Sequence, residues 1–292
     1  MNPLIYTFGS GLAFFVGVAV VLISVLLFRL GASRLAASLV SILALLGLAI
    51  SGLSAAPLSY WYYGVAGLVT LAWLASERRR SRDAAPKPEQ AHALRYAVVA
   101  IWLGGAALEL PHHFAPRLAP LGNPPLYIIG DSLTAGAGMN ERQTWPDLLP
   151  PGIQVQSFAQ PGANAASAMH QAGQIPAGAS LVLVEIGGND LLGDTSAAEF
   201  ERDLKALLTD IARPHRTVVM FELPLPPTYN EFGRIQRRLA ARHGVRLIPK
   251  RVLMGVLAQG DTTLDSIHLS PGGHRRMAAA VWRVIEPVYK LR

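Results

Sequence analysis

The first third of the chain is nearly all apolar, and this feature constrains its fold more than any other. No charged side chain occurs from Met1 to Phe28, and "GLAFFVGVAVVLISVLLF" within this run matches the length of about 20 apolar residues that crosses a bilayer as a helix. Arg29 and Arg34 follow the run rather than precede it, and no small-residue cleavage site accompanies it. We therefore expect an uncleaved membrane anchor rather than a signal peptide.

Two further apolar segments predict three more membrane helices. Residues 35–76 are uncharged over about twice a spanning length, and Pro57 with an aromatic cluster interrupts them, which predicts two helices joined by a tight turn. The rings of residues 60–63 suit the membrane–water interface. The last segment, residues 96–108, is short and is expected to span if the Arg95 side chain snorkels to the interface. The sequence thus predicts a transmembrane region of about four helices within residues 1–110.

The basic residues between these segments predict the orientation of the chain. Arg29 and Arg34 mark the first loop as cytoplasmic, and the run "ERRRSR" at residues 77–82 marks the third loop in the same way. Two crossings between these loops make the assignments consistent. A fourth crossing places everything after Pro111 in the periplasm of a bacterium, whereas its absence leaves that part in the cytoplasm. We expect a multi-pass inner-membrane protein with a periplasmic C-terminal domain.

Composition and charge exclude several function classes. The formal net charge is +7, but the densest basic run lies between apolar segments, so we expect a membrane partner and no nucleic-acid partner. The chain has no cysteine, which excludes disulfides, thiolate metal sites and a cysteine nucleophile. The adjacent His112 and His113 have no nearby carboxylate in the sequence, so no metal site is expected there.

The remainder of the chain changes character. Residues 111–125 are proline-rich and predict a stiff linker, and residues 126–292 alternate short apolar runs with amphipathic ones. This alternation is typical of an α/β domain with a mostly parallel sheet, covered on both faces, whose binding crevice lies at the carboxyl ends of the strands. The predicted strands are "LYIIG", "IQVQSFA", "LVLVEIG", "TVVMFELP" and "VRLIP", and the predicted helices include "AAEFERDLKALLTDIAR", "EFGRIQRRLAARHG" and "GGHRRMAAAVWRVIEPVY".

Residues suited to nucleophilic catalysis follow the predicted strands. A serine hydroxyl needs a base to take its proton, and the base needs a carboxylate to orient it. Ser132 follows the first strand, and the last loop contains His268 as the candidate base and Asp265 as the candidate carboxylate. Backbone N–H groups at Ser132 and Gly162 and the side-chain amide of Asn189 are candidate donors to an oxyanion. Each motif is unspecific alone, and their combination at strand ends indicates a hydrolase.

Two acidic residues beside these positions have a simpler interpretation. Asp131 precedes the candidate nucleophile and Asp190 follows the candidate donor Asn189. Short acidic side chains in turns commonly accept hydrogen bonds from nearby backbone N–H groups. We therefore expect both carboxylates to order the loops and not to transfer protons.

Four sequence blocks resemble those of a known family. "GDSL" after the first strand, a glycine after the second, "GGND" after the third and "DSIH" near the C-terminus resemble the SGNH hydrolases, also called GDSL esterases. The resemblance covers roughly residues 126–289 and extends to the branch of bacterial arylesterases, acyl thioesterases and lysophospholipases. It implies a flavodoxin-like three-layer α/β/α fold without metal or organic cofactor. It also implies a nucleophilic Ser132, a triad completed by Asp265 and His268, and an oxyanion hole with Gly162 and Asn189.

Three functions remain open from the sequence. The first is a membrane-anchored serine esterase that hydrolyses acyl esters or thioesters, with lipid-linked and glycan-linked substrates both compatible. The second is an O-acyltransferase or deacetylase that uses the same triad on an envelope polysaccharide. The third is a partner-binding or sensory membrane module with the hydrolase domain as its effector. Ester against thioester and the acyl chain length are not determined by these motifs.

Overall fold

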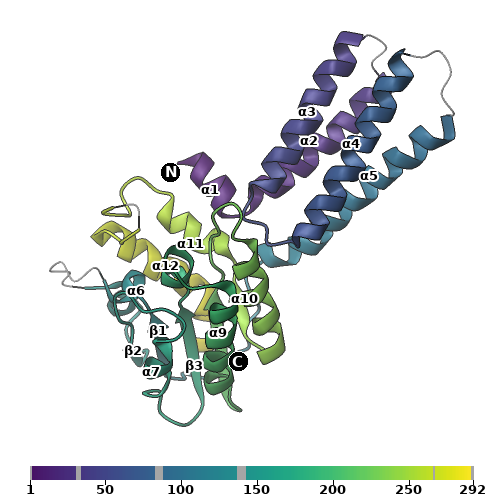
Figure 1. Ribbon diagram of the computed structural model, residues 1–292. Helices are drawn as coiled ribbons and strands as arrows, with labels where there is room; N and C mark the ends of the chain where they lie inside the picture. The colour runs from purple at the N-terminus through teal and green to yellow at the C-terminus, as the bar shows by residue number, and fades with distance from the viewer. Residues whose placement is uncertain (1, 31–33, 83–87, 137–142, 266, 291–292) are drawn as a thin grey trace. The chain divides into compact units, whose positions relative to one another are not determined.

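A computed structural model describes residues 2–30, 34–82, 88–136, 143–265 and 267–290 (Figure 1). The chain forms two compact units, a helical unit of Thr7–Pro111 with Pro226–Asn230 and an α/β unit of Met1–Tyr6, His112–Leu225 and Glu231–Arg292. Part of the predicted cytoplasmic loop, residues 83–87, lies outside the described residues, as do the side chains of the predicted orientation residues Arg29 and Arg34. Each unit is described by itself below.

Within the described part of the helical unit, four helices are long. They are α2 (Leu12–Leu30), α3 (Arg34–Gly52), α4 (Tyr60–Arg82) and α5 (Pro88–Glu109). The short helix α1 (Pro3–Gly9) precedes α2 in the chain. Their shared core contains the buried rings of Phe14, Trp73 and Trp102.

Among the described residues, two helices are long and apolar enough to cross a membrane, over Leu35–Gly52 and His92–His113. A third candidate arises if α1 and α2, which meet at 89°, form one broken span. The helix α4 is not among the candidates; it begins with four aromatic residues and ends with the basic run that follows Glu77. The structure therefore bears out apolar helices in this region, and the number of about four spans stays a prediction.

Close backbone approach joins α2 to α3. A Cβ atom on Gly17 would lie 2.5 Å from the carbonyl oxygen of Gly47, and one on Gly47 would lie 2.8 Å from the carbonyl oxygen of Gly17. Only glycine allows this separation, so the two helices pack in the small-residue manner that is common in membranes.

The expectation for Arg95 is wrong. The guanidinium does not snorkel, because it donates to both carboxylate oxygens of Glu77, with Nε 2.5 Å from Oε1 and Nη2 2.9 Å from Oε2, and both side chains are buried. The pair links α5 to α4, and Trp73 Nε1 also donates to the same carboxylate at 3.2 Å. A charge that is paired in this way no longer needs to reach water or headgroups.

The expectation for the aromatic cluster holds only in part. Trp61 is 84% exposed, as a ring at an interface would be. Tyr62 and Tyr63 instead pack on Phe14, with ring centroids 6.4 and 6.2 Å away. Half of the cluster therefore belongs to the core of the helical unit.

The α/β unit is built on a five-stranded parallel sheet. Its strand order is β2-β1-β3-β4-β5, the flavodoxin-like order in which successive strands are added first on one side of β1 and then, from β3 on, on the other, while all strands stay parallel. Each predicted strand is present, in most cases over fewer residues than predicted. The strands are β1 (Leu126–Gly130), β2 (Val155–Ser157), β3 (Ser180–Glu185), β4 (Arg216–Phe221) and β5 (Arg246–Ile248).

Both faces of the sheet are buried, as a doubly covered parallel sheet requires. Alternate strand residues such as Ile128 and Leu183 join one core with η2 (Trp145–Leu148), α11 (Lys250–Leu257) and α12 (Pro271–Tyr289). The helices α7 (Ala168–Ala172), α9 (Ala197–Ile211) and α10 (Asn230–His243) are associated with one another, since α7 packs on α9 and the Phe200 and Phe232 rings meet at 5.0 Å.

The predicted proline-rich linker packs on the α/β unit. It begins with the short helix η1 (Leu110–His113), and Leu118 is buried in the sheet core. The Leu121 N–H donates to the Val288 carbonyl at 2.9 Å. The segment after His113 is therefore held against α12.

Candidate active site

The candidate nucleophile lies where β1 turns into the short helix α6 (Ser132–Ala135). Gly130 ends the strand, and a Cβ there would lie 2.6 Å from Cβ of Thr134, so glycine is needed for the tight turn. Asp131 caps α6 by accepting from Leu133 N at 2.9 Å. Ser132 is 8% exposed. It lies at the carboxyl edge of the sheet, where the sequence predicts the binding crevice.

Asn189 joins the loop that holds Ser132 to the loop that holds Gly162. It lies in α8 (Gly188–Leu192), directly after β3, and its Nδ2 donates to the carbonyl of Ala163 at 2.8 Å and to Oδ2 of Asp131 at 3.2 Å. Ala163 follows Gly162, whose φ of +76° favours glycine. The structure thus brings the three predicted oxyanion donors to one edge of the sheet.

His268 and Asp265 contact each other directly. Nδ1 of His268 lies 2.6 Å from Oδ2 of Asp265, and the backbone N–H of His268 donates to Oδ1 at 2.8 Å. The side-chain hydrogen bond from His268, reinforced by the backbone N–H groups of His268 and Ile267, lowers the pKa of Asp265 to about 2. An ionised carboxylate on Nδ1 favours the tautomer that leaves Nε2 free to act as a base.

An electrostatic effect relates the His268 pair to the loop of Ser132. Burial raises the pKa of Asp131, and the opposing influences are the Leu133 N–H, a hydrogen bond with Glu185 and the positive charge of His268. This charge effect is small beside burial, and the union of the β1 turn and the last loop in one catalytic site is part of the function proposed below.

Glu185 is a site residue that the sequence reasoning missed. It ends β3, is fully enclosed, and its Oε2 accepts from Thr134 Oγ1 at 2.9 Å and from Asp131 N at 3.4 Å. Burial and the negative charge of Asp131 raise its pKa well above the usual range for a glutamate. The signal was present, since an acidic residue inside the apolar run "LVLVEIG" has no simple role in a strand.

Asp190 and Asn164 order the loops around the site. Asp190 Oδ2 accepts from Ala165 N at 2.8 Å, and Asn164 Oδ1 accepts from Ser167 N at 2.9 Å. With the cap that Asp131 provides, these contacts confirm the expectation that the flanking acidic residues bind backbone N–H groups. In the ranges that the structure describes, no group of three His, Asp or Glu side chains could hold a metal ion, including around His112 and His113.

Comparison with protein families shows the family of the α/β unit. The model of the GDSL-like Lipase/Acylhydrolase family matches residues 128–276, about half of the chain and most of the α/β unit. The chain belongs to this GDSL family of hydrolases. The four blocks that indicated SGNH hydrolases lie within or at the edge of the matched residues.

Individual relatives match the same part of the chain. The Esterase TesA of Pseudomonas aeruginosa is 28% identical over 178 residues, which cover 56% of this chain and 88% of the relative. The Thioesterase 1/protease 1/lysophospholipase L1 of Escherichia coli is 31% identical over 135 residues, covering 42% of this chain and 65% of the relative. A crystal structure of TesA is 26% identical, covers 56% of this chain and 98% of its own, and superposes with a TM-score of 0.48.

Proposed function

We propose that this protein is a membrane-anchored serine esterase that hydrolyses acyl esters or thioesters. Ser132 is the nucleophile, His268 the general base and Asp265 the carboxylate that orients it. The observation that carries the proposal is the 2.6 Å contact between His268 Nδ1 and Asp265 Oδ2 in a GDSL-family hydrolase. The names of the relatives, an esterase and a thioesterase, support the choice of acyl substrates.

In the first half of the reaction, Ser132 Oγ attacks the acyl carbonyl carbon while His268 Nε2 takes the hydroxyl proton. The carbonyl oxygen becomes an oxyanion that the N–H groups of Ser132 and Gly162 and the Asn189 amide would bind. Collapse of this intermediate breaks the bond to the alcohol or thiol, which leaves with the proton from His268. The product is an ester between the acyl group and Ser132.

In the second half, water replaces the alcohol. His268 takes a proton from water, the hydroxide attacks the acyl carbon, and Ser132 regains its proton as the acid leaves. Asp265 stabilises the imidazolium in both halves and stays ionised, in agreement with its pKa of about 2.

The amide of Asn189 explains how the oxyanion hole is kept in order before substrate binds. Both of its N–H bonds are used in the structure, one to Ala163 O at 2.8 Å and one to Asp131 Oδ2 at 3.2 Å. Binding an oxyanion requires one N–H to change acceptor, and the longer bond to Asp131 is the weaker of the two. We infer that Asp131 holds this N–H until the oxyanion takes its place.

The helical unit supplies the anchor in this proposal. Its apolar helices over Leu35–Gly52 and His92–His113 support membrane insertion, and the basic residues of the predicted loops support a periplasmic position for the α/β unit. The chain would then be a multi-pass protein of a bacterial inner membrane with its site outside the cytoplasm.

A fluorescent fluorophosphonate tests the nucleophile. Full-length protein in native membranes is treated with the probe, and wild type is compared with Ser132→Ala and with Ser157→Ala, a serine in β2 that has no proposed role in the reaction. We expect labelling of wild type and Ser157→Ala and none of Ser132→Ala, because only an activated serine attacks the phosphorus. Labelling of Ser132→Ala at the wild-type level would disprove the assignment.

The same reagent tests the side of the membrane when it carries a permanent charge. Cells whose outer membrane alone is permeabilised should be labelled as strongly as cells whose inner membrane is also broken. Labelling that needs an open inner membrane would place the site in the cytoplasm and leave the esterase assignment intact.

A further inference from the structure

A cavity of about 440 Å³ lies between α11 and α12 in the α/β unit. Its floor is apolar, with Val252 and Val256 from α11 and Ala280 and Val284 from α12. None of the proposed catalytic residues lines it. The cavity is therefore separate from the site described above, and it has no role in the proposed hydrolysis.

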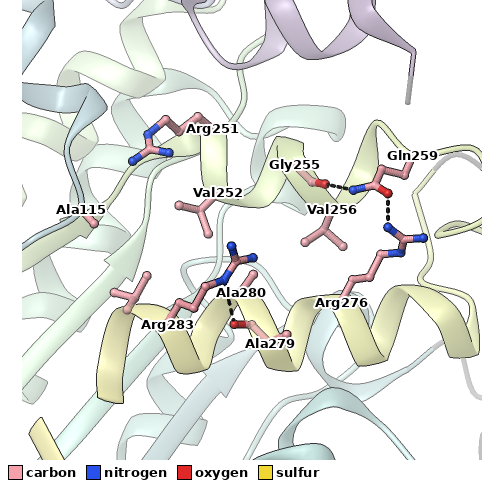
Figure 2. Close-up of a pocket in the computed structure, with 11 residues that line it drawn as sticks. Ala115, Arg251, Val252, Gly255, Val256, Gln259, Arg276, Ala279, Ala280 and Arg283 are labelled. Atoms are coloured by element: carbon pink, nitrogen blue, oxygen red, sulfur yellow. Dashed lines mark hydrogen bonds between the residues drawn. The ribbon is translucent and has the colours of Figure 1, made fainter. Parts of the chain in front are cut away.

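Three arginines line this cavity. Figure 2 shows Arg251 on α11 at the end of the cavity near Ala115, Arg283 on α12 below Val252, and Arg276 on α12 at the other end, next to Gln259. Arg276 and Arg283 are about 10 Å apart along one side of the helix, since seven residues make about two turns. An apolar floor with a cationic rim fits a ligand that has an anionic head beside an apolar body.

The positive charge of the cavity is compensated only in part. Arg276 pairs with Asp261 at 3.2 Å and also contacts Gln259. Arg251 Nε donates to the His113 carbonyl at 2.5 Å, and Arg283 Nε donates to the Ala279 carbonyl at 3.3 Å. Among the described residues, neither Arg251 nor Arg283 forms an ion pair with a carboxylate, so two positive charges are available to an anion.

One residue bonded to the lining of this cavity is also the end of a candidate membrane span. Arg251 bonds to His113, which is the last residue of the candidate span His92–His113. Ala115, another lining residue, follows shortly after and is within about 7 Å of His113 along the chain. Phospholipid headgroups are the anionic and amphipathic molecules that a surface tethered at this distance meets.

We propose that this cavity binds the phosphate group of an anionic phospholipid, with Arg251 and Arg283 as its principal ligands. Guanidinium groups suit phosphate because they offer paired N–H donors in a plane. The choice of a lipid as the source of phosphate rests on the membrane anchoring in the proposed function. Binding would hold the α/β unit on the bilayer surface by a second attachment, in addition to the chain itself.

Binding of a short-chain phosphatidylglycerol tests this proposal. Full-length protein in a zwitterionic detergent is titrated with dihexanoyl phosphatidylglycerol, with dihexanoyl phosphatidylcholine and with inorganic phosphate, by calorimetry. The cavity variant is Arg251→Gln with Arg283→Gln. The matched control is Arg242→Gln with Arg246→Gln, which removes two exposed arginines of the same unit that do not line the cavity.

We expect the cavity variant to bind phosphatidylglycerol about thirtyfold more weakly than wild type, and the control to bind it as wild type does. Equal affinity in wild type and the cavity variant, or an equal loss in the control, would overturn the proposal. Inorganic phosphate that binds as tightly as phosphatidylglycerol would overturn the lipid as the source.

Two further measurements distinguish failure of lipid binding from other causes: one controls for misfolding of the double variant, and the other tests the proposed esterase function separately. The single variant Arg283→Gln removes only a bond to a carbonyl of its own helix and should still weaken lipid binding. Hydrolysis of a soluble acyl ester should be equal in all variants, because none of the four arginines is in the proposed site. Absence of hydrolysis in wild type would refute the esterase while leaving the lipid titration valid.

Discussion

Asp265 holds His268 by two hydrogen bonds, one to the ring at 2.6 Å and one to the backbone at 2.8 Å. The first prediction is that Asp265→Asn lowers kcat by about 10⁴, because an amide can favour the wrong imidazole tautomer. Steady-state hydrolysis of an acyl ester measures the loss. Asp194→Asn in the exposed loop after α8 is the control and should keep wild-type activity. An equal kcat in both variants would show that His268 does not depend on this carboxylate.

The pH dependence of this pair follows from the lowered pKa of Asp265, about 2 in the folded protein against an ordinary value of about 4. The pair's contribution to stability is therefore present above pH 4 and is lost as the pH falls through 2. Asp265→Asn should consequently lose less stability than wild type over this window in acid unfolding experiments. A steeper acid loss in the variant would contradict this sign.

The second prediction concerns the proposed oxyanion hole. Asn189→Ala should lower kcat by about 10² to 10³ with a smaller effect on KM, because the amide acts on charge that develops in the transition state. Asn164→Ala is the control, since Asn164 bonds to Ser167 within its own loop. A change in KM with kcat unaffected would assign Asn189 to substrate binding instead.

The third prediction is a pH-dependent role for Glu185. Burial raises the pKa of Glu185 in the folded protein. Its contribution to the free energy of unfolding is therefore complete below the ordinary glutamate pKa of about 4.3 and is lost as the pH rises through the pKa of the folded state. Glu185→Gln retains an acceptor oxygen for the Asp131 N–H and the Thr134 hydroxyl and does not ionise, so its stability should fall less as the pH rises. Glu185→Leu should be less stable than both and lower kcat. Chemical unfolding at several pH values measures this, and parallel curves for wild type and Glu185→Gln would refute it.

The sequence predicted those features that depend on residues close together in the chain, and it missed those that depend on contacts between distant segments. The helix over Ala197–Ile211 and the strand over Ser180–Glu185 were predictable because their apolar residues repeat with the period of the element. The helix Lys250–Leu257 was not predicted, because it is short and directly follows a strand. The order of blocks made Ser132, Asn189, Asp265 and His268 candidates, and their catalytic roles stay predictions. Glu185 required knowledge of what the turn after β1 packs against.

The same distinction explains the errors in the membrane region. The sequence around Arg95, a single arginine at the start of an apolar run, gives no sign of its partner. That partner, Glu77, lies 18 residues earlier in the chain and on another helix, α4. The aromatic cluster was likewise interpreted from composition, although position on the helix decides which rings face Phe14 and which face outward.

The fourth prediction uses two adjacent glycines at the start of α12. A Cβ on Gly273 would lie 2.0 Å from the carbonyl oxygen of Thr262, whereas one on Gly272 would be 3.3 Å from the nearest atom, the Asp261 carbonyl oxygen. Gly273→Ala should therefore cost about 2–4 kcal/mol and lower activity, since Thr262 begins the loop that carries His268. Gly272→Ala should change stability by less than about 1 kcal/mol. Thermal unfolding compares them, and equal stabilities would contradict the close packing.

The fifth prediction exploits the absence of cysteine from the chain. Ala198→Cys, on the exposed side of α9, should react with a membrane-impermeant maleimide in cells whose outer membrane alone is open. Arg79→Cys, beside the predicted cytoplasmic loop, should react only after the inner membrane is broken. The reverse pattern would invert the topology.

The ion pair of Glu77 and Arg95 also bears on how the protein is made. Removing one partner of a buried ion pair typically costs about 3–5 kcal/mol, whereas the joined pair is satisfied by two helices that are neighbours in the chain. During synthesis α4 precedes α5, so the Glu77 carboxylate keeps the Trp73 N–H of its own helix but lacks the guanidinium of Arg95 until the later helix leaves the ribosome. We therefore expect α4 and α5 to fold together as a hairpin, in which each helix depends on the other for the burial of its charge.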